Sequence, residues 1–306
     1  MTMATASDGQ GSGIEIISRE PVTGGFSGAP KFSLRVAMNQ YGRRIERTVL
    51  VKHTSQLEIS ATQAAATVAG ADAVPEIIET GTDELGPYLM TAFYDAEPAA
   101  NEASLPANAI QTLARVHVHY LDESPPQSIP VVDAAWWRAK CDVSMQRLAA
   151  IDRSVPNELI PHVAALQHDP RITSLLDQLP RTLLHGDVHH NNVLVDENQT
   201  GHIIDWGGAL VGTPALDIAN LGGPASSGYQ TYVDTWRHLT GRNLDTDPDW
   251  NTSYLLATVW INIKYLAFAA KIYGDTKAQD MMRTALDALS QLGPTPCPSM
   301  NTRSRR

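Results

Sequence analysis

Three polar residues near the middle of the 306-residue chain, Asp187, Asn192 and Asp205, have the types and order that phosphoryl transfer requires. Asp187 stands in the pattern H-x-D-x-x-x-x-N that ends at Asn192, and Asp205 follows thirteen residues later. The carboxylate of Asp187 could accept the proton of an attacking hydroxyl. The amide oxygen of Asn192 and the carboxylate of Asp205 suit a hard cation such as Mg²⁺. These residues predict the transfer of a phosphate group to a hydroxyl, with Mg²⁺ on the donor phosphates.

The segments between Asn192 and Asp205 are those of a tight hairpin. An apolar run at 193–195 and an apolar pair at 203–204 flank a polar turn at 197–201. Such a hairpin brings Asn192 and Asp205 together at one end. This placement matters because a loose phosphoryl-transfer transition state is stabilised mainly by positioned groups and charges.

The first part of the chain, residues 14–93, is predicted to form a β-rich unit. Residues 31–38 alternate apolar and polar side chains, and residues 46–53 contain a β-branched run, with a turn at 39–42 between them. This arrangement predicts a hairpin. A helix is expected at 55–69, and the remaining strands are expected at 14–19, 76–79 and 88–93.

Two features of this unit could bind phosphate. Lys52 ends the second hairpin strand, where a lysine can act as a point charge for phosphate oxygens. A loop whose glycines allow backbone N–H groups to approach phosphates precedes the hairpin. The loop residues are Gly24, Gly25, Phe26, Ser27 and Gly28.

The second part, residues 107–292, is predicted to be mostly helical, and residues 94–106 are expected to link the two units. The predicted class is α+β, with a small antiparallel sheet and one helix in an N-lobe and a larger helical C-lobe. The residues at 1–13 and 293–306 are expected to be disordered tails. The expected helices lie at 107–120, 131–151, 157–179, 214–221, 226–239, 250–273 and 276–291.

The segment HGDVHHNNVLV…HIIDW…GTPALDIANL resembles the aminoglycoside phosphotransferase and choline-kinase-like family, a branch of the protein-kinase-like fold. The resemblance implies that Asp187 is the catalytic base, that Asn192 and Asp205 bind the metal, and that Asp217 braces the catalytic loop. It covers about residues 20–290, and four matched elements in order make it specific.

The resemblance also implies roles for the remaining candidates. Lys52 would bind the nucleotide phosphates and pair with a glutamate of the next helix. Glu58 is the only acid in residues 54–71, although it lies two or three residues earlier than the family spacing suggests. Structural support would come from His185 and His189, and the nucleotide hinge would consist of Thr91, Ala92 and Phe93.

Alternative interpretations remain open for several of these residues. Asp187, Asn192 and Asp205 could merely cap turns, Lys52 and Glu58 could be solvated, and the glycine loop could be an ordinary turn. A nucleotide-binding pseudokinase would keep the same residues without turnover. A zinc-dependent hydrolase would use the histidines at 185, 189 and 190.

The acceptor is not defined by a motif. Asn262 and Lys264 interrupt an apolar helix and are candidate substrate contacts. C-lobe aromatic residues could stack on a substrate but favour a core role, and aspartates at 234, 245, 247 and 249 could form an acidic rim for a polyamine. We expect an antibiotic-modifying kinase, with a metabolite kinase for choline, a sugar or homoserine as the alternative.

Composition limits the partners. The net charge of −10 argues against a nucleic-acid-backbone binder, and two cysteines in 306 residues do not form a disulfide framework. No apolar run has the length of a membrane span, and the N-terminus lacks the pattern of a signal peptide. We therefore expect a cytoplasmic enzyme that uses ATP or GTP and Mg²⁺ on a small-molecule hydroxyl substrate.

Overall fold

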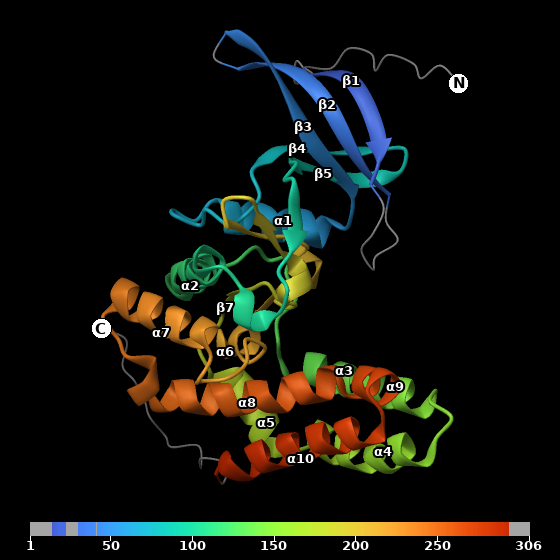
Figure 1. Ribbon diagram of the computed structural model, residues 1–306. Helices are drawn as coiled ribbons and strands as arrows, with labels where there is room; N and C mark the ends of the chain where they lie inside the picture. Colours follow the sequence, from blue (N-terminus) through green and yellow to red (C-terminus); the bar gives the residue numbers. More distant parts are fainter. Residues whose placement is uncertain (1–13, 23–29, 41, 294–306) are drawn as a thin grey trace.

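The N-terminal part is an antiparallel sheet of five strands with one helix beneath it (Figure 1). The computed structural model describes residues 14–22, 30–40 and 42–293. The strand order in the sheet is β1–β2–β3–β5–β4. The strands are β1 (Ile14–Pro21), β2 (Lys31–Gln40), β3 (Arg43–His53), β4 (Ile77–Asp83) and β5 (Gly86–Ala92).

Alternation of side chains along β2 and β3 produces the small core of this sheet. The two strands pair antiparallel from Lys31↔Lys52 to Gln40↔Arg43, so every second residue points to the same face. Apolar side chains on that face are removed from water. They are Leu34, Val36, Val49, Val51 and Met90. The predicted hairpin is present, and its strands are longer than the patterns at 31–38 and 46–53 indicate.

Helix α1 (Gln56–Ala66) connects the sheet to the rest of the protein. Ser55 caps its N-terminus by accepting a hydrogen bond from the backbone N–H of Glu58. Its alanines Ala61, Ala64 and Ala65 belong to the large core of the C-terminal part. The helix is therefore held by both parts of the molecule.

The C-terminal part is mainly helical, with two small sheets at its upper edge, and it lies below the five-stranded sheet in Figure 1. The strands are β6 (Ala96–Pro98), β7 (Thr182–Leu184), β8 (Val193–Asp196), β9 (Gly201–Ile203) and β10 (Leu210–Gly212). The α-helices are α2 (Ala107–Asp122), α3 (Ala134–Ala149), α4 (Ser154–Gln167), α5 (Pro170–Gln178), α6 (Ala215–Ile218), α7 (Ser227–Thr240), α8 (Pro248–Lys264), α9 (Leu266–Ile272) and α10 (Asp275–Gln291). The 3-10 turns are η1 (Glu102–Ser104), η2 (His190–Asn192), η3 (Trp206–Gly208) and η4 (Leu244–Thr246).

Strands β8 and β9 form the predicted hairpin. Val193 pairs with Ile203, and the backbone N–H of Ile204 donates to the carbonyl oxygen of Asn192 at 2.9 Å. The two ends of the hairpin, which carry Asn192 and Asp205, therefore lie together. Strand β6 pairs with β8, so the segment expected to be a plain linker at 94–106 contains a strand of this sheet.

The helix predicted over residues 250–273 is two helices. The chain leaves α8 at Tyr265, whose φ and ψ are −99° and 4°, and α9 continues at 45° to α8. No glycine or proline marks this break in the sequence. Phe268, in α9, is 53% exposed.

Prolines modify two other predicted helix boundaries. Pro156 lies in the first turn of α4, which begins at Ser154 and not at residue 157, and a missing N–H costs no helical hydrogen bond there. Pro170 occupies the first turn of α5, so the helical segment expected over 157–179 consists of two helices.

No single helix in the described ranges is long and apolar enough to cross a membrane. Helices α8 and α9 reach that length and composition only as a pair, across their 45° bend. The expected tails and the glycine loop lie largely outside the described residues, at 1–13, 23–29 and 294–306.

Candidate active site

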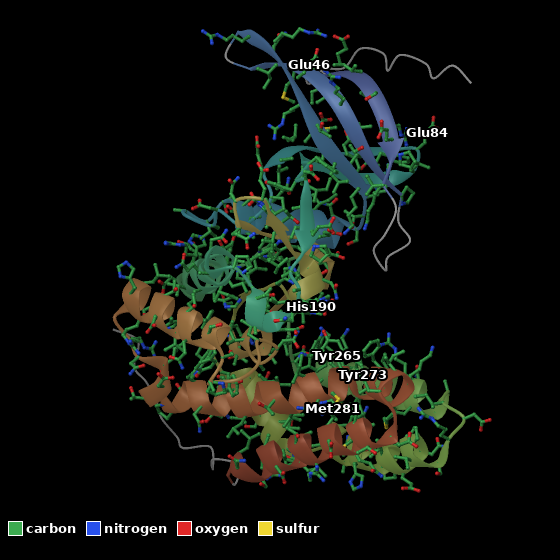
Figure 2. All side chains as sticks on the ribbon, in the orientation of Figure 1. Glu46, Glu84, His190, Tyr265, Tyr273 and Met281 are labelled. Carbon is green, nitrogen blue, oxygen red and sulfur yellow. The ribbon has the colours of Figure 1, made fainter. Side chains whose placement is uncertain are left out.

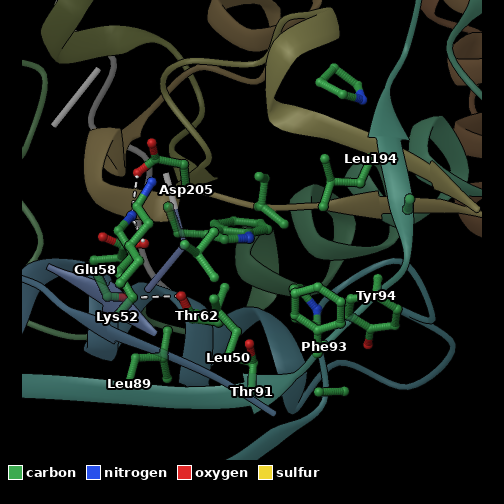
Figure 3. A pocket seen from close by; sticks show the side chains of 18 of the residues that line it. Leu50, Lys52, Glu58, Thr62, Leu89, Thr91, Phe93, Tyr94, Leu194 and Asp205 are labelled. Carbon is green, nitrogen blue, oxygen red and sulfur yellow. Dashed lines mark hydrogen bonds and ion pairs between the residues drawn. The ribbon is translucent and has the colours of Figure 1, made fainter. Parts of the chain in front are cut away.

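Lys52 is held between two carboxylates at the boundary of the two parts (Figure 3). Its ammonium group lies 2.6 Å from Glu58 Oε1 and 2.9 Å from Asp205 Oδ1. Lys52 and Glu58 are 9% and 4% exposed. Burial lowers the pKa of Lys52, but the charges of Glu58 and Asp205 raise it above its usual value, so Lys52 is a fixed positive charge.

The early position of Glu58 in its helix explains how this ion pair forms. Ser55 starts α1 three residues after Lys52 and places Glu58 in the first turn. The Thr54 hydroxyl also donates to Glu58 Oε2. The structure thus forms the pair that the spacing argument made doubtful, and Thr54 is a partner that the sequence did not indicate.

Asp205 and Asn192 lie at the same end of the β8–β9 hairpin, and each has a side-chain oxygen that could bind a metal. Asp205 follows β9 in the left-handed conformation (φ 65°, ψ 58°), which aspartate tolerates better than most residues. Its side chain is 43% exposed. The Asn192 amide nitrogen donates to the carbonyl oxygen of Asp187 at 2.9 Å, which leaves the amide oxygen available. One carboxylate and one amide oxygen form a donor set that fits Mg²⁺.

The histidines do not form a metal cluster. Within the described residues, no three His, Cys, Asp or Glu side chains are grouped to hold a metal ion. His190, which could have been solvated, lies 2.7 Å from Glu102. The zinc-hydrolase interpretation therefore has no site in the described part of the chain.

Asp217 fixes the start of the catalytic loop, which we define as residues 185–192. Its carboxylate accepts hydrogen bonds from the backbone N–H groups of His185 (2.7 Å) and Gly186 (2.8 Å). His117 Nε2 lies 3.2 Å from the same carboxylate, and the Tyr232 hydroxyl contacts the other ring nitrogen of His117 at 2.8 Å. No pattern in the sequence points to His117, which lies 100 residues from Asp217, or to Tyr232.

His185 is a neutral side chain that supports the loop from inside. It is fully buried, and burial lowers its pKa. Its Nδ1 accepts from the backbone N–H of Asp187 at 3.3 Å, so Nε2 carries the proton and donates to the carbonyl oxygen of Ile204 at 2.9 Å. This ring therefore joins the catalytic loop to the residue before Asp205.

Only glycine can occupy position 186. Gly186 has a φ of +78°, and a Cβ there would lie 1.9 Å from the carbonyl oxygen of Gly208. A Cβ on Gly208 would approach Asp187 Cβ at 3.2 Å, and one on Gly207 would approach Asp205 Oδ1 at 3.4 Å. Gly208 thus lies against Asp187, and its neighbour Gly207 lies against Asp205.

The carboxylate of Asp187 is contacted by side chains at the end of α8 and in the catalytic loop. Lys264 Nζ and the Tyr265 hydroxyl lie 2.6 Å and 2.8 Å from Oδ1, and His189 Nε2 lies 3.6 Å from Oδ2. Burial raises the pKa of Asp187, but His189 and Lys264 lower it by more, so the net pKa is well below the usual range. Tyr265 lies below His190 in Figure 2, on the upper side of the helical part.

The two candidate acceptor contacts behave differently. Lys264 donates both to Asp187 and to the carbonyl oxygen of Gly186 at 2.9 Å. The Asn262 amide donates to the carbonyl oxygen of Thr258 in its own helix at 2.8 Å. Asn262 is also not among the residues that line the cavity containing Asp187.

Asp187 and Asp205 line two different cavities. The first, of about 410 Å³, is lined by Lys52, Glu58, Asp205 and the segment 91–94. We name it the nucleotide-side cavity because it contains the candidate phosphate-binding lysine (Figure 3). The second, of about 290 Å³, is lined by Gly186, Asp187 and residues of α3 and α8, and we name it the acceptor-side cavity.

The proposed hinge residues line the nucleotide-side cavity. Two of their backbone N–H groups, however, already donate hydrogen bonds within the protein. The N–H of Ala92 donates to Glu76 at 2.9 Å, and that of Phe93 donates to Thr48 at 3.3 Å. The N–H of Tyr94 has no partner in the described ranges. Tyr94, which stacks on His202 with ring centroids 3.7 Å apart, is therefore a further hinge candidate.

The C-lobe aromatic residues are mostly core. Trp236, Trp250 and Trp260 are at most 6% exposed, whereas Tyr273 is 66% exposed. The aspartates considered as an acidic rim do not line the acceptor-side cavity. Asp247 and Asp249 line a different cavity beside Arg242.

We expect Asp217→Asn to destabilise the protein by about 3–5 kcal/mol at pH 7, because it leaves two backbone donors and His117 without their buried carboxylate. Burial raises the pKa of Asp217, but His117 lowers it by more. The stabilisation is therefore complete above the unfolded pKa of about 3.8 and is lost as the pH falls through the lower folded value. Urea unfolding at pH 7 and pH 3.5 checks this; a difference between wild type and variant that grew at pH 3.5 would contradict it.

The family comparison covers most of the chain. The model of the phosphotransferase enzyme family (APH) matches residues 42–254, which include Lys52 and the whole segment from His185 to Asp217.

Solved structures share the fold at low sequence identity. Choline kinase from Cryptosporidium parvum Iowa II has a TM-score of 0.56 and 13% identity, over 92% of this chain and 90% of that one. Macrolide 2'-phosphotransferase MphH from Brachybacterium faecium has a TM-score of 0.53 and 14% identity, over 94% and 95%. A thermostable mutant of aminoglycoside phosphotransferase APH(4)-Ia has a TM-score of 0.51 and 16% identity, over 90% and 95%.

These likenesses establish a two-lobe, kinase-like α+β fold, as the sequence predicts. The match to the family model extends over more than half of the chain and includes the motif-bearing segment. The chain belongs to the phosphotransferase enzyme family.

Proposed function

We propose that this protein transfers the γ-phosphate of ATP or GTP to a hydroxyl of a small molecule, with Asp187 as the base and Mg²⁺ held by Asn192 and Asp205. One observation carries the proposal. Asp187 lines the acceptor-side cavity, Asp205 lines the nucleotide-side cavity, and the adjacent glycines Gly208 and Gly207 lie against these two residues. A donor and an acceptor in these two cavities would meet beside both carboxylates.

The nucleotide side supplies charge and backbone donors. Lys52, fixed by Glu58, offers a positive charge for phosphate oxygens. Residues Thr91 to Phe93 line the cavity, and the N–H of Tyr94, which has no partner among the described residues, could bind the nucleobase. The glycine loop at 24–28 lies outside the described residues and stays a proposed phosphate contact. Bound Mg²⁺ would neutralise charge on the phosphates.

The acceptor side supplies the base. Oδ1 of Asp187 is occupied by Lys264 and Tyr265, so Oδ2 is the atom that would receive the hydroxyl proton. The acceptor oxygen forms a bond to the γ-phosphorus. The bond from that phosphorus to the β–γ bridging oxygen breaks, and its electron pair leaves with the nucleoside diphosphate.

The division into an N-lobe at 14–93, a linker at 94–106 and a C-lobe at 107–292 is part of the proposal. Under it, the reaction takes place between the lobes. The acceptor classes to be tested are antibiotics, which would make this a resistance enzyme, and hydroxyl metabolites. Growth protection of a sensitive host by the expressed protein separates the two classes.

A nucleotide-consumption screen with mass spectrometry of the products tests the proposed function. We expect a phosphate ester from at least one hydroxyl compound and none when EDTA removes the divalent cations. Asp205→Asn should lower turnover at least about a hundredfold, because the charge of the metal contributes several kcal/mol to the transition state. Asp177→Asn is the matched control, since Asp177 pairs with Arg181 on the surface.

Two results would contradict the proposal. One is nucleotide binding without an ester from any compound, which would favour the pseudokinase interpretation. The other is an Asp205→Asn variant that turns over as fast as the Asp177→Asn control.

A further inference from the structure

The acceptor-side cavity is lined by three cations. Lys140 and Arg147 lie on α3, seven residues apart, and Lys264 ends α8. A spacing of seven places two side chains on the same helix face. Trp136, one turn before Lys140, and Ser144, between Lys140 and Arg147, line the cavity as well. One face of α3 therefore presents positive charge to the residue that we propose as the base.

Two of these cations, Lys140 and Arg147, have no carboxylate partner in the described part of the chain. Asp187 is the only carboxylate among the described residues that line the cavity, and it is paired with Lys264. Lys140 and Arg147 form no ion pair within the described ranges. Burial, followed by the charges of Lys264 and Arg147, lowers the pKa of Lys140. Grouping like charges in this way is unfavourable unless an anion joins them.

Asp142 on α3 and two aspartates of the proposed acidic rim have partners outside this cavity. Asp142, also on α3, accepts a hydrogen bond from Gln167 at 2.6 Å and does not line the cavity. Asp234 pairs with Arg237, and Asp247 pairs with Arg242. An acidic rim for a polyamine is therefore not present in the described walls of this cavity.

The walls and the size of the cavity also restrict the ligand. Trp136 and Trp260 lie with ring centroids 4.6 Å apart, and both line the cavity. Lys140 Nζ lies 5.5 Å from the centroid of the Trp136 ring, so cation and ring share one wall. A volume of about 290 Å³ is at the low end for ligand sites and suits a small molecule.

We propose that the acceptor is a small hydroxyl compound with a carboxylate or phosphate group, which Lys140 and Arg147 bind while the hydroxyl lies at Asp187. The shared chemistry is an oxyanion, and an apolar or aromatic body would pack on Trp136 and Trp260. This inference rests on the proposed function for the position of the hydroxyl. Binding of the anionic group, in contrast, can be measured whether or not the hydroxyl is phosphorylated.

Two matched series test the oxyanion and distinguish its sources. The carboxylate series is 4-(hydroxymethyl)benzoate, its neutral amide and 4-(aminomethyl)benzyl alcohol. The phosphate series is glucose 6-phosphate, glucose and glucosamine. Binding is measured by calorimetry with a non-hydrolysable ATP analogue and Mg²⁺ present, and phosphorylation is measured separately with ATP. In at least one series, the anion should bind about tenfold more tightly than its neutral member and more tightly still than the amine.

Substitutions of Lys140 and Arg147 test whether these two side chains cause the preference for an anionic ligand. Arg147→Gln and Lys140→Gln should each weaken binding of the anionic member about tenfold and leave binding of the neutral member within about twofold. Arg138→Gln is the matched control, because Arg138 lies on the same helix and does not line the cavity. Melting temperatures of all three variants show whether they are folded.

The inference is overturned if neither series favours its anion, or if Arg138→Gln has the same effect as Arg147→Gln. Failure of the proposed function looks different: the anion binds selectively, yet no ester forms from any member of either series. A preference for the amines would overturn the inference and leave the kinase proposal intact.

Discussion

Asp187→Asn should lower kcat by about 10²–10⁴-fold, which is the range for loss of a positioned general base. The amide has nearly the shape of the carboxylate, but it cannot take the proton of the acceptor hydroxyl. Asp187 does not line the nucleotide-side cavity, so the affinity for ATP should change by less than about threefold. Steady-state turnover and calorimetric titration with a non-hydrolysable ATP analogue measure the two effects.

The matched control is again Asp177→Asn, which removes a surface carboxylate on α5 and should leave both values unchanged. Stability must be compared as well, because Lys264 loses its charged partner in the Asp187 variant. A folded Asp187→Asn protein with near wild-type kcat would remove Asp187 from the role of base.

Lys52→Met should have the second large effect, on stability and on nucleotide binding together. It leaves Glu58, which is 4% exposed, as a buried carboxylate without its cation. Breaking a buried pair from one side costs about 3–5 kcal/mol. The substitution also removes the positive charge that we propose binds the nucleotide phosphates, so ATP affinity and kcat should both fall. Urea unfolding and nucleotide titration measure these changes.

Adding Glu58→Gln to Lys52→Met separates the two effects. The double variant buries no unpaired charge at this place, so most of the lost free energy of unfolding should return. Turnover should not return, since the charge at position 52 is still absent. Recovery of activity along with stability would show that Lys52 serves the fold and not the phosphates.

The fold class and the family could be predicted because their signals are local. Period-two alternation in residues 31–38 indicates a strand, and the apolar runs around residues 197–201 indicate a hairpin. The hairpin alone was enough to bring Asn192 and Asp205 to the same end. The family spacing made an ion pair between Glu58 and Lys52 doubtful, because Glu58 lies early in its helix. The pair forms because Ser55 caps α1 early enough for Glu58 to reach Lys52.

The surroundings of Asp187 could not be predicted in the same way. Lys264 and Tyr265 reach it from 77 and 78 residues away, at a break between α8 and α9 that no glycine or proline marks. The contact of His117 with Asp217 spans 100 residues. Periodicity reports which face of a helix is apolar, but it does not report which distant helix that face meets.

The charge of the acceptor-side cavity could not be predicted from the sequence either. The sequence offered clustered aspartates at 234–249 as a site for a cationic acceptor. In the fold, α3 brings Lys140 and Arg147 into the cavity of Asp187, while Asp234 and Asp247 pair with arginines elsewhere. Net charge of the whole chain therefore says little about the charge of one cavity.

The central claim is that phosphate passes from the nucleotide to an acceptor hydroxyl. ³¹P NMR of the reaction with an acceptor whose hydroxyl carries ¹⁸O tests it most directly. We predict a phosphate ester whose phosphorus signal shows the isotope shift of a bond to ¹⁸O, because the acceptor oxygen itself attacks the γ-phosphorus. Release of inorganic phosphate with no labelled ester would contradict the claim.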